Sequence, residues 1–211
     1  AYECVAGAQR VVGKRDSDLL LALSNCFAAS SSSEAVAQRL GAINALLGKA
    51  GLAPLYRVRA TEPLTLNNIG ANSEPASDAT RAKVSVLMPA YNAGAQIEVA
   101  LRSLLAQSWN NLEILVVDDC STDDTAQRVQ ILAASDARIV PLKTPRNGGA
   151  YAARNLALAH ATGEFITVHD SDDWSHPEKV ATQVRYLLEH TEAIASITDW
   201  ARAREDLYFT G

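Results

Sequence analysis

The sequence contains only three cysteines and no long hydrophobic run. Cys4, Cys26 and Cys120 are too far apart for a disulfide framework or a CxxC metal motif, so we interpret them as buried thiols in a reducing compartment. The longest apolar stretches, at 19–23 and 114–117, are far shorter than the roughly 20 residues that a bilayer helix needs. The sequence therefore predicts no transmembrane segment.

A secretion signal and an excess of basic residues are also absent. Residues 1–8 lack the basic start and apolar block of a signal peptide, so we expect a cytoplasmic protein, with peripheral attachment to the inner face of a membrane left open. The 19 basic and 24 acidic residues give a net charge of -5, whereas nucleic-acid backbones are bound by clustered Lys and Arg. Nucleic acid is therefore not an expected partner.

The composition is that of a soluble globular protein. The chain has 211 residues, 48% hydrophobic and 20% charged, which is enough for one domain or slightly more. Residues 1–52 are predicted to form a helical hairpin, because apolar residues recur at helical spacing over 16–27 and again from Ser33 onwards. The apolar stripe of this hairpin would pack against a partner or against the rest of a longer chain. Residues 53–82, rich in proline and polar residues, are predicted to be a linker.

From residue 83 to residue 211, short apolar runs alternate with helical patterns. Strands are expected at 84–88, 112–117, 138–142, 164–169 and 194–198, with helices at about 97–105, 124–133, 150–161 and 177–190 between them. This alternation is typical of an α/β domain with a mostly parallel sheet and helices on both faces. Ligands of such sheets bind beyond the carboxyl ends of the strands, so the candidate site lies just after each strand.

Acidic residues follow two of these predicted strands. Asp118 and Asp119 come after the second strand, and the run 170–173 (DSDD) comes after the fourth. Carboxylates gathered at one edge of a sheet repel each other, and a bound cation is the simplest way to keep them ionised. Hard oxygen ligands favour Mg²⁺, Mn²⁺ or Ca²⁺ over zinc. Each run also has a structural explanation, because aspartates commonly cap helices and serve turns.

Two further segments complete the predicted edge. Tyr91 follows the first strand, where its ring would offer a flat apolar face to a base. The turn at Asn147, Gly148 and Gly149 allows close backbone approach, and Arg154 lies on the helix that follows, within reach of a base or a phosphate. The set predicts a site for a nucleotide diphosphate, in which a metal ion neutralises the charge on a departing diphosphate.

Read in order, these segments resemble the family 2 glycosyltransferases, which have the GT-A fold. The resemblance is carried by VSVLMPAYNA, LEILVVDDCSTDDT, NGGAYAARN and GEFITVHDSDDW and extends from about residue 83 to residue 198. It implies a Rossmann-like sheet and an inverting, hexosyltransferase-type enzyme with a nucleotide-diphosphate sugar donor, often a UDP-sugar. It also implies help from Mn²⁺ or Mg²⁺ and a glycan, lipid-linked or protein acceptor.

The resemblance assigns roles in the binding of the donor. The residues expected to bind its nucleotide are Pro89, Ala90 and Tyr91 in the base pocket, Asp119 on uracil or ribose with Asp118 beside it, Arg154 facing the nucleotide, and Asn147, Gly148 and Gly149 in the wall.

The DSDD run corresponds to the family's metal-binding DXD motif. Asp170, Ser171 and Asp172 match the motif, with Asp172 as the expected direct metal ligand and Asp173 as the alternative. His169, directly before the motif, is interpreted as a filler of the strand end without a catalytic role.

No residue is assigned as the catalytic base. An inverting transfer needs a carboxylate that takes the proton of the acceptor hydroxyl, and in the resembled family this group lies beyond the span that ends at residue 211. Asp199, Glu205 and Asp206 follow the DSDD run too closely to serve. We therefore expect a domain over 83–211 that is truncated at its C-terminal end and binds the donor without full activity.

Two alternatives stay open at this stage. The ILVVDD segment resembles the acidic pocket of a signalling receiver domain, with Asp170 as the aspartate that would accept a phosphoryl group. A non-catalytic binding module, in which the N-terminal hairpin docks a partner, is the other alternative.

Overall fold

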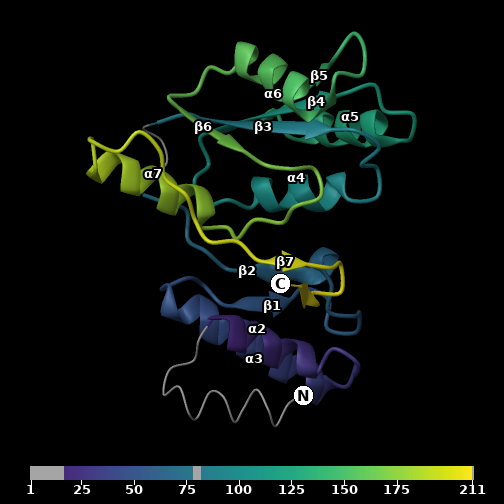
Figure 1. Cartoon of the computed structure of the whole chain (residues 1–211), viewed down its shortest axis with the longest axis vertical. Coiled ribbons are helices and arrows are strands. Elements are labelled where there is room, and N and C mark those ends of the chain that lie inside the picture. Colours follow the sequence, from purple (N-terminus) through teal and green to yellow (C-terminus); the bar gives the residue numbers. More distant parts are fainter. Residues whose placement is uncertain (1–16, 78–81, 211) are drawn as a thin grey trace. The chain divides into compact units, whose positions relative to one another are not determined.

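The computed structural model describes residues 17–77 and 82–210 (Figure 1). The chain divides into two compact units. One extends from residue 74 to residue 197, and the other combines the segment up to residue 73 with the segment from residue 198 onwards. We describe each unit by itself.

The unit over 74–197 is built on a four-stranded sheet. The strands are β3 (Val84–Ala90), β4 (Leu112–Asp118), β5 (Ile139–Lys143) and β6 (Phe165–Val168), in the order β5-β4-β3-β6. All three strand pairs are parallel, so every strand ends at the same edge of the sheet. β3 and β4 are buried at every position, as expected for central strands of a sheet covered on both faces. The predicted α/β fold is confirmed.

Four helices cover the two faces of this sheet. They are α4 (Ile97–Leu105), α5 (Thr125–Ser135), α6 (Gly149–His160) and α7 (Lys179–Glu189). Alternate residues of β3 and β4, such as Val86 and Ile114, pack with α4, α5 and α7 in one apolar cluster. The residues between them, such as Leu87 and Leu115, pack with α6 in a second cluster on the opposite face (Figure 1). Helices therefore cover both faces, as predicted.

The last predicted strand, at 194–198, does not form. These residues have no regular secondary structure, and Ile194 and Ile197 are almost fully exposed. A strand needs a hydrogen-bonded neighbour, and within the described residues none pairs with this segment. The apolar residues at 194–198 predicted a strand, but without a neighbouring strand among the described residues to pair with they do not form one.

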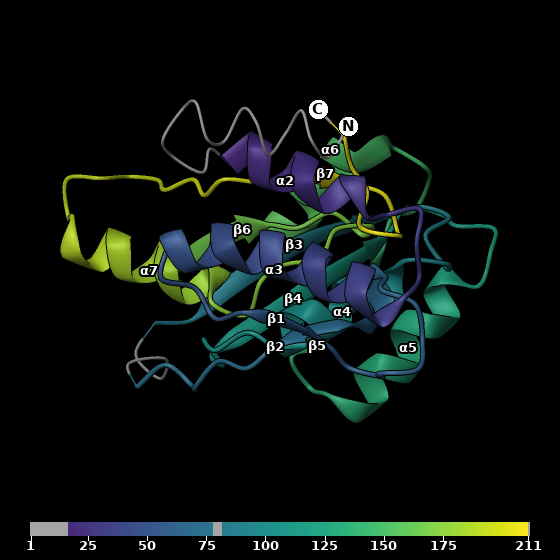
Figure 2. The same ribbon diagram turned by 90° about the horizontal axis from the view of Figure 1, so that it is seen from below.

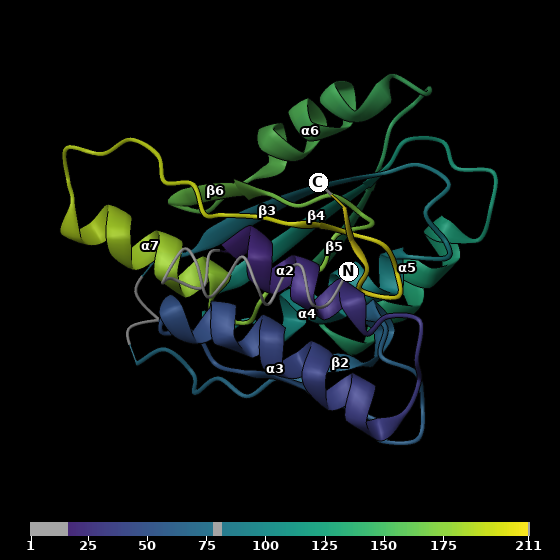
Figure 3. The same ribbon diagram turned by 60° about the horizontal axis from the view of Figure 1, so that its bottom comes forward.

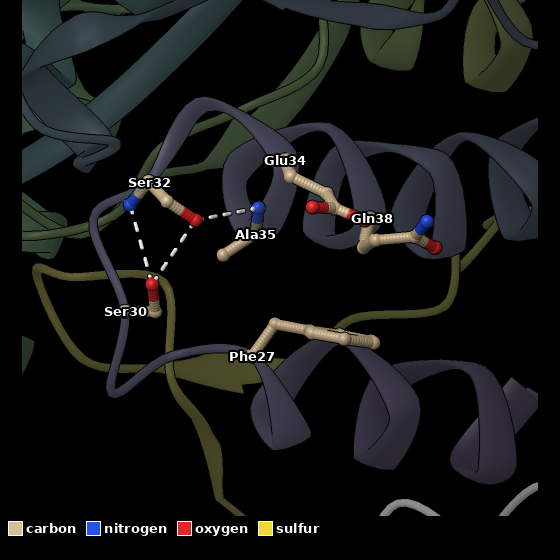
Figure 4. Close-up of a pocket in the computed structure, with 6 residues that line it drawn as sticks. All are labelled: Phe27, Ser30, Ser32, Glu34, Ala35 and Gln38. Carbon is tan, nitrogen blue, oxygen red and sulfur yellow. Dashed lines mark hydrogen bonds between the residues drawn. The ribbon is translucent and has the colours of Figure 1, made fainter.

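The second unit contains the predicted helical hairpin. Helices α2 (Ser17–Cys26) and α3 (Ser33–Lys49) lie side by side (Figures 2 and 3). Ser32 caps α3, because its Oγ accepts a hydrogen bond from the backbone N–H of Ala35 at 3.2 Å (Figure 4). Ser30 adds a hydrogen bond to the Oγ of Ser32, which fixes the turn between the helices.

The boundaries of this unit differ from the predicted ones. The expected linker at 53–82 contains β1 (Leu55–Arg57), the short helix η1 (Leu66–Asn68) and β2 (Ile69–Ala71), which pairs with β1. Residues 198–210 also belong here, with β7 (Arg202–Ala203) and β8 (Phe209–Thr210) forming a small hairpin. The side chain of Asn25 holds this hairpin through two hydrogen bonds to the backbone of Phe209, at 2.7 and 2.9 Å.

Two sequence-based expectations concern cysteines and membrane spans. Cys26 and Cys120 are free and half-buried, not fully buried, and Cys4 lies outside the described residues. Among the described helices, none combines the length and hydrophobicity needed to traverse a bilayer.

Candidate nucleotide-binding site

A cavity of about 530 Å³ opens at the edge of the sheet where the parallel strands end. Most of the predicted site residues line it, and they come from the ends of β3 and β4, the start of α6 and the loop after β6. Those residues are Pro89, Ala90, Tyr91, Asp119, Asn147, Gly149, Arg154, Asp170, Ser171 and Asp172. The structure therefore brings together residues that are up to 83 positions apart in the sequence, from Pro89 to Asp172.

Three predicted site residues do not line the cavity. Asp118 is buried at the end of β4, and its Oδ1 accepts a hydrogen bond from the backbone N–H of Ser121 at 3.0 Å. Lys143 of the neighbouring strand lies 3.8 Å from the other carboxylate oxygen of Asp118. Gly148 and Asp173 are also not among the lining residues, although the backbone N–H of Gly148 donates to the carboxylate of Asp119. Because neighbouring residues at a strand end point in different directions, only Asp119 of the Asp118–Asp119 pair reaches the cavity.

Sequence reasoning missed four lining residues. They are Asn92, Ala93, Gln96 and Ala150. Each directly follows or lies near a predicted site residue, so their position in the strand-end turn was the available signal. Asn92 has a φ of 48°, a left-handed conformation that asparagine tolerates better than most residues.

The turn that carries Tyr91 is tied to the loop after β4. The backbone N–H of Asn92 donates to Ser121 Oγ at 3.0 Å, and that of Ala93 donates to Thr125 Oγ1 at 2.8 Å. The Tyr91 ring itself is 53% exposed beside the cavity. A fixed backbone with an exposed aromatic ring is suited to stacking against a planar ligand.

Asp119 organises the part of the cavity wall formed by the start of α6. It is buried, and its carboxylate accepts a hydrogen bond from Thr144 Oγ1 at 2.6 Å, from the backbone N–H of Gly148 at 3.0 Å and from that of Gly149 at 2.6 Å. Burial by itself raises the pKa of this carboxyl, but the hydrogen bonds from Thr144, Gly148 and Gly149 outweigh it and hold the pKa below its usual value. Asp119 is therefore ionised at neutral pH and fixes the start of α6.

Both glycines of this turn are required by the local geometry. Gly149 has a φ of 80°, in the left-handed region that side chains disfavour. At Gly148, a Cβ atom would lie 2.7 Å from the Cβ of Ala152, which is closer than two carbon atoms approach. The turn can therefore place two N–H groups on Asp119 only because neither position has a side chain.

The loop after β6 presents carboxylates to the same cavity. Asp170 Oδ1 accepts a hydrogen bond from Arg154 Nη2 at 2.5 Å, so α6 and the loop are joined by an ion pair. Asp172 lines the cavity beside it. The pKa of Asp173 is raised by desolvation and then by the charges of Asp172 and Asp170. The loop is therefore rich in negative charge at its exposed side.

His169 lies beneath this loop and is almost fully buried. Its Nδ1 is 2.9 Å from the carbonyl oxygen of Asp170. Burial, reinforced by the nearby Lys179 ammonium, lowers the pKa of His169 to about 4, so the ring is neutral at pH 7. Its Nε2 is buried and has no hydrogen-bond partner within the described residues, and the interpretation of His169 as a strand-end filler stays a prediction.

The residues present fit a divalent cation with an incomplete set of protein ligands. Within residues 17–77 and 82–210, no three His, Cys, Asp or Glu side chains converge on one point, so the predicted trio Asp170, Asp172 and Asp173 does not form a closed cage. Of these three aspartates, only Asp170 and Asp172 line the cavity. Mg²⁺ is commonly held by one or two carboxylates together with water and substrate phosphates, and this donor set fits that pattern.

Comparison with known proteins identifies the family. A family profile described as glycosyl transferase family 2 matches residues 85–207, which is more than half of the chain. The chain belongs to glycosyltransferase family 2. The match spans the sheet and the cavity of this family 2 chain, and it excludes the receiver-domain alternative.

Curated relatives match about half of this chain. A UDP-Glc:α-D-GlcNAc-diphosphoundecaprenol β-1,3-glucosyltransferase of Escherichia coli, WfgD, is 42% identical over 107 residues, covering 51% of this chain and 42% of its own length. A putative teichuronic acid biosynthesis glycosyltransferase of Bacillus subtilis, TuaG, is 38% identical over 123 residues, covering 58% and 48%. The family 2 chain thus spans less than half the length of these relatives.

Two solved structures are similar to part of this chain. Residues 1–349 of TarS from S. aureus are 37% identical, with a TM-score of 0.49, over 52% of this chain and 33% of that one. A Pyrobaculum calidifontis mannosyltransferase, described in complex with GDP-Man and Mn²⁺, is 26% identical, with a TM-score of 0.48, over 80% and 44%.

Proposed function

We propose that the cavity binds a nucleotide-diphosphate sugar, preferably a UDP-sugar, and that the protein transfers this sugar to an acceptor. The observation that carries the proposal is the composition of one cavity: an exposed aromatic ring at Tyr91, an ordered carboxylate at Asp119, a cationic Arg154 and the carboxylates Asp170 and Asp172. These groups match a base, a ribose, a diphosphate and a cation in turn. The UDP-Glc substrates in the names of two E. coli relatives support a uridine nucleotide.

Each group of the cavity has a distinct part in donor binding. Tyr91 stacks on the base, and the turn at 147–149 supplies a wall that Asp119 holds rigid. Arg154 pairs with the negative charge of the diphosphate. Asp170 and Asp172 would hold Mn²⁺ or Mg²⁺, which when bound neutralises charge on the diphosphate leaving group. The charges of the cavity thus complement a donor and its cation.

The proposed transfer inverts the anomeric carbon and requires a base. The carboxylates that line the cavity are Asp119, Asp170 and Asp172, and all three already have a role. Asp119 in particular accepts hydrogen bonds from the wall and has a lowered pKa, which makes it a weak base. The proposal is therefore that this chain binds the donor without full transfer activity, and that the acceptor is a glycan, a lipid-linked sugar or a protein.

A thermal-shift screen with nucleotide diphosphates and their sugars tests donor binding. In the presence of Mn²⁺, ligand at about 100 times its dissociation constant is expected to add about 2.7 kcal/mol of stability, or roughly 5–10 °C in Tm for a protein of this size. Asp172→Ala is expected to remove this gain, because it removes a cation ligand, while leaving the Tm without ligand nearly unchanged.

Asp199→Ala is the matched control for this experiment, because Asp199 is an exposed aspartate outside the cavity. It is expected to keep the full gain in Tm. A wild-type protein that gains no stability from any nucleotide would instead favour the alternative of a non-catalytic module that binds a partner through the N-terminal helices.

A further inference from the structure

One ion pair crosses the candidate donor cavity. Arg154 projects from α6, and its Nη2 donates to Oδ1 of Asp170, in the loop after β6, at 2.5 Å. Both residues line the cavity. The side chain of Arg154 is 25% exposed and that of Asp170 is 51% exposed, so a cation from solvent can reach the Asp170 carboxylate, whereas the guanidinium is partly buried.

The other contacts of Arg154 are weak. Its Cζ lies 5.6 Å from the centre of the Tyr151 ring, on the same helix. Its Nε is buried and has no hydrogen-bond partner within the described part of the chain. The Asp170 carboxylate is therefore the main polar anchor of the guanidinium, which is held in place by a group that the proposed function assigns to a cation.

We propose that Arg154 and a divalent cation compete for the Asp170 carboxylate when no nucleotide is bound. This inference rests on the proposed function. A guanidinium and a divalent cation both need the negative charge of the same carboxylate oxygen, and two cations at one oxygen repel each other. When the cation holds Asp170, the guanidinium of Arg154 is released and becomes available to the diphosphate.

The competition has a consequence for the order of binding. Without nucleotide, a cation must break the Arg154–Asp170 pair and leave a half-buried guanidinium without a counter-charge. With a nucleotide diphosphate present, the phosphates replace Asp170 as the partner of Arg154. Cation and nucleotide therefore bind with positive cooperativity, and by linkage each raises the affinity for the other by the same factor.

Mn²⁺ binding to the nucleotide-free protein, followed by electron paramagnetic resonance, tests this inference. Arg154→Gln is expected to bind Mn²⁺ about two- to fivefold more tightly than the wild type, which is the factor that corresponds to a partly exposed ion pair. The same variant is expected to bind UDP more weakly in the presence of Mn²⁺. General damage to the site would lower the affinity for both Mn²⁺ and UDP. A higher affinity for Mn²⁺ together with a lower affinity for UDP therefore identifies competition.

Three further variants test whether the charge of Arg154 and the carboxylate of Asp170 cause the change in Mn²⁺ affinity. Arg154→Lys keeps the charge and is expected to leave Mn²⁺ affinity near that of the wild type. Arg154→Gln combined with Asp170→Asn is expected to show no gain, because the shared carboxylate is absent. Arg102→Gln is the control, since Arg102 forms a 2.6 Å ion pair with Glu98 on α4 and does not line the cavity.

The outcomes separate this inference from the proposed function. Wild-type protein that binds UDP with Mn²⁺, together with equal or weaker Mn²⁺ binding by Arg154→Gln, would overturn the competition and leave the donor site intact. Absence of Mn²⁺ binding by both proteins would overturn the competition and the metal site together.

Discussion

Asp119→Asn is expected to lower the free energy of unfolding by about 3 kcal/mol and to abolish nucleotide binding. The substitution keeps the size of the side chain, but it replaces one acceptor oxygen by an NH₂ group that faces the N–H groups of Gly148 and Gly149. Buried donors that lose a charged acceptor pay their full desolvation cost. The turn before α6 would then lose its defined position, and with it one wall of the cavity.

The contribution of Asp119 to the free energy of unfolding also depends on pH and decreases in acid. Because the pKa in the folded protein lies below that of the unfolded chain, the contribution is complete at neutral pH and is lost as the pH falls through the lowered value. Urea denaturation of the wild type, Asp119→Asn and the exposed control Asp199→Asn measures the effect. Equal midpoints for Asp119→Asn and the wild type would show that the hydrogen-bonded turn contributes nothing.

Glu113 is expected to make a second large contribution, at the opposite end of β4. Its side chain is 10% exposed and accepts hydrogen bonds from Ser85 Oγ at 2.5 Å, Lys83 Nζ at 2.6 Å and the backbone N–H of Thr162 at 2.6 Å. Desolvation by itself raises the pKa of Glu113, but the hydrogen bonds from Lys83, Ser85 and Thr162 lower it to about 2. This network joins β3, β4 and the segment that leads into β6.

The shift in the pKa of Glu113 predicts acid sensitivity. A fall from 4.5 to about 2 corresponds to about 3 kcal/mol of stability, present above pH 4.5 and lost as the pH falls towards 2. Glu113→Gln is expected to lose a similar amount at pH 7 and to show a smaller further loss in acid. Denaturation midpoints at pH 7 and pH 3 measure both effects, and a wild-type protein with the same stability at the two values would contradict the account.

Nucleotide binding distinguishes these two substitutions. Glu113 lies near the amino end of β4, whereas the cavity lies at the carboxyl end, so folded Glu113→Gln is expected to bind nucleotide as the wild type does. Asp119→Asn is expected to lose binding even under conditions in which it stays folded. A residue that contributes only to stability and a residue that also contributes to nucleotide binding thus lie at opposite ends of β4.

The sheet and the edge that carries the cavity could be predicted because their signals are local. Uninterrupted apolar runs, such as those of β3 and β4, are characteristic of buried parallel strands, and parallel strands end at one edge by construction. Tyr91, Asp119 and Asp172 each follow such a run, which is why their meeting in one cavity could be predicted from the sequence.

What could not be predicted depends on contacts between distant segments or on the direction of single side chains. The union of 198–210 with the N-terminal helices relies on pairs such as Asn25 and Phe209, which are 184 positions apart. Asp118 and Asp119 have the same local pattern, and only the direction of each side chain at the strand end decides which one lines the cavity. The partners of Asp119 and Asp170, namely the turn at 148–149 and Arg154, became apparent only from the folded geometry.

Calorimetric titration of UDP into the protein, with Mn²⁺ and again with a chelator, tests the central claim most directly. The account predicts saturable binding at one site with Mn²⁺ and much weaker binding with the chelator, because Asp170 and Asp172 bind the diphosphate only through a cation. Binding of equal strength in both titrations, or no binding in either, would contradict it.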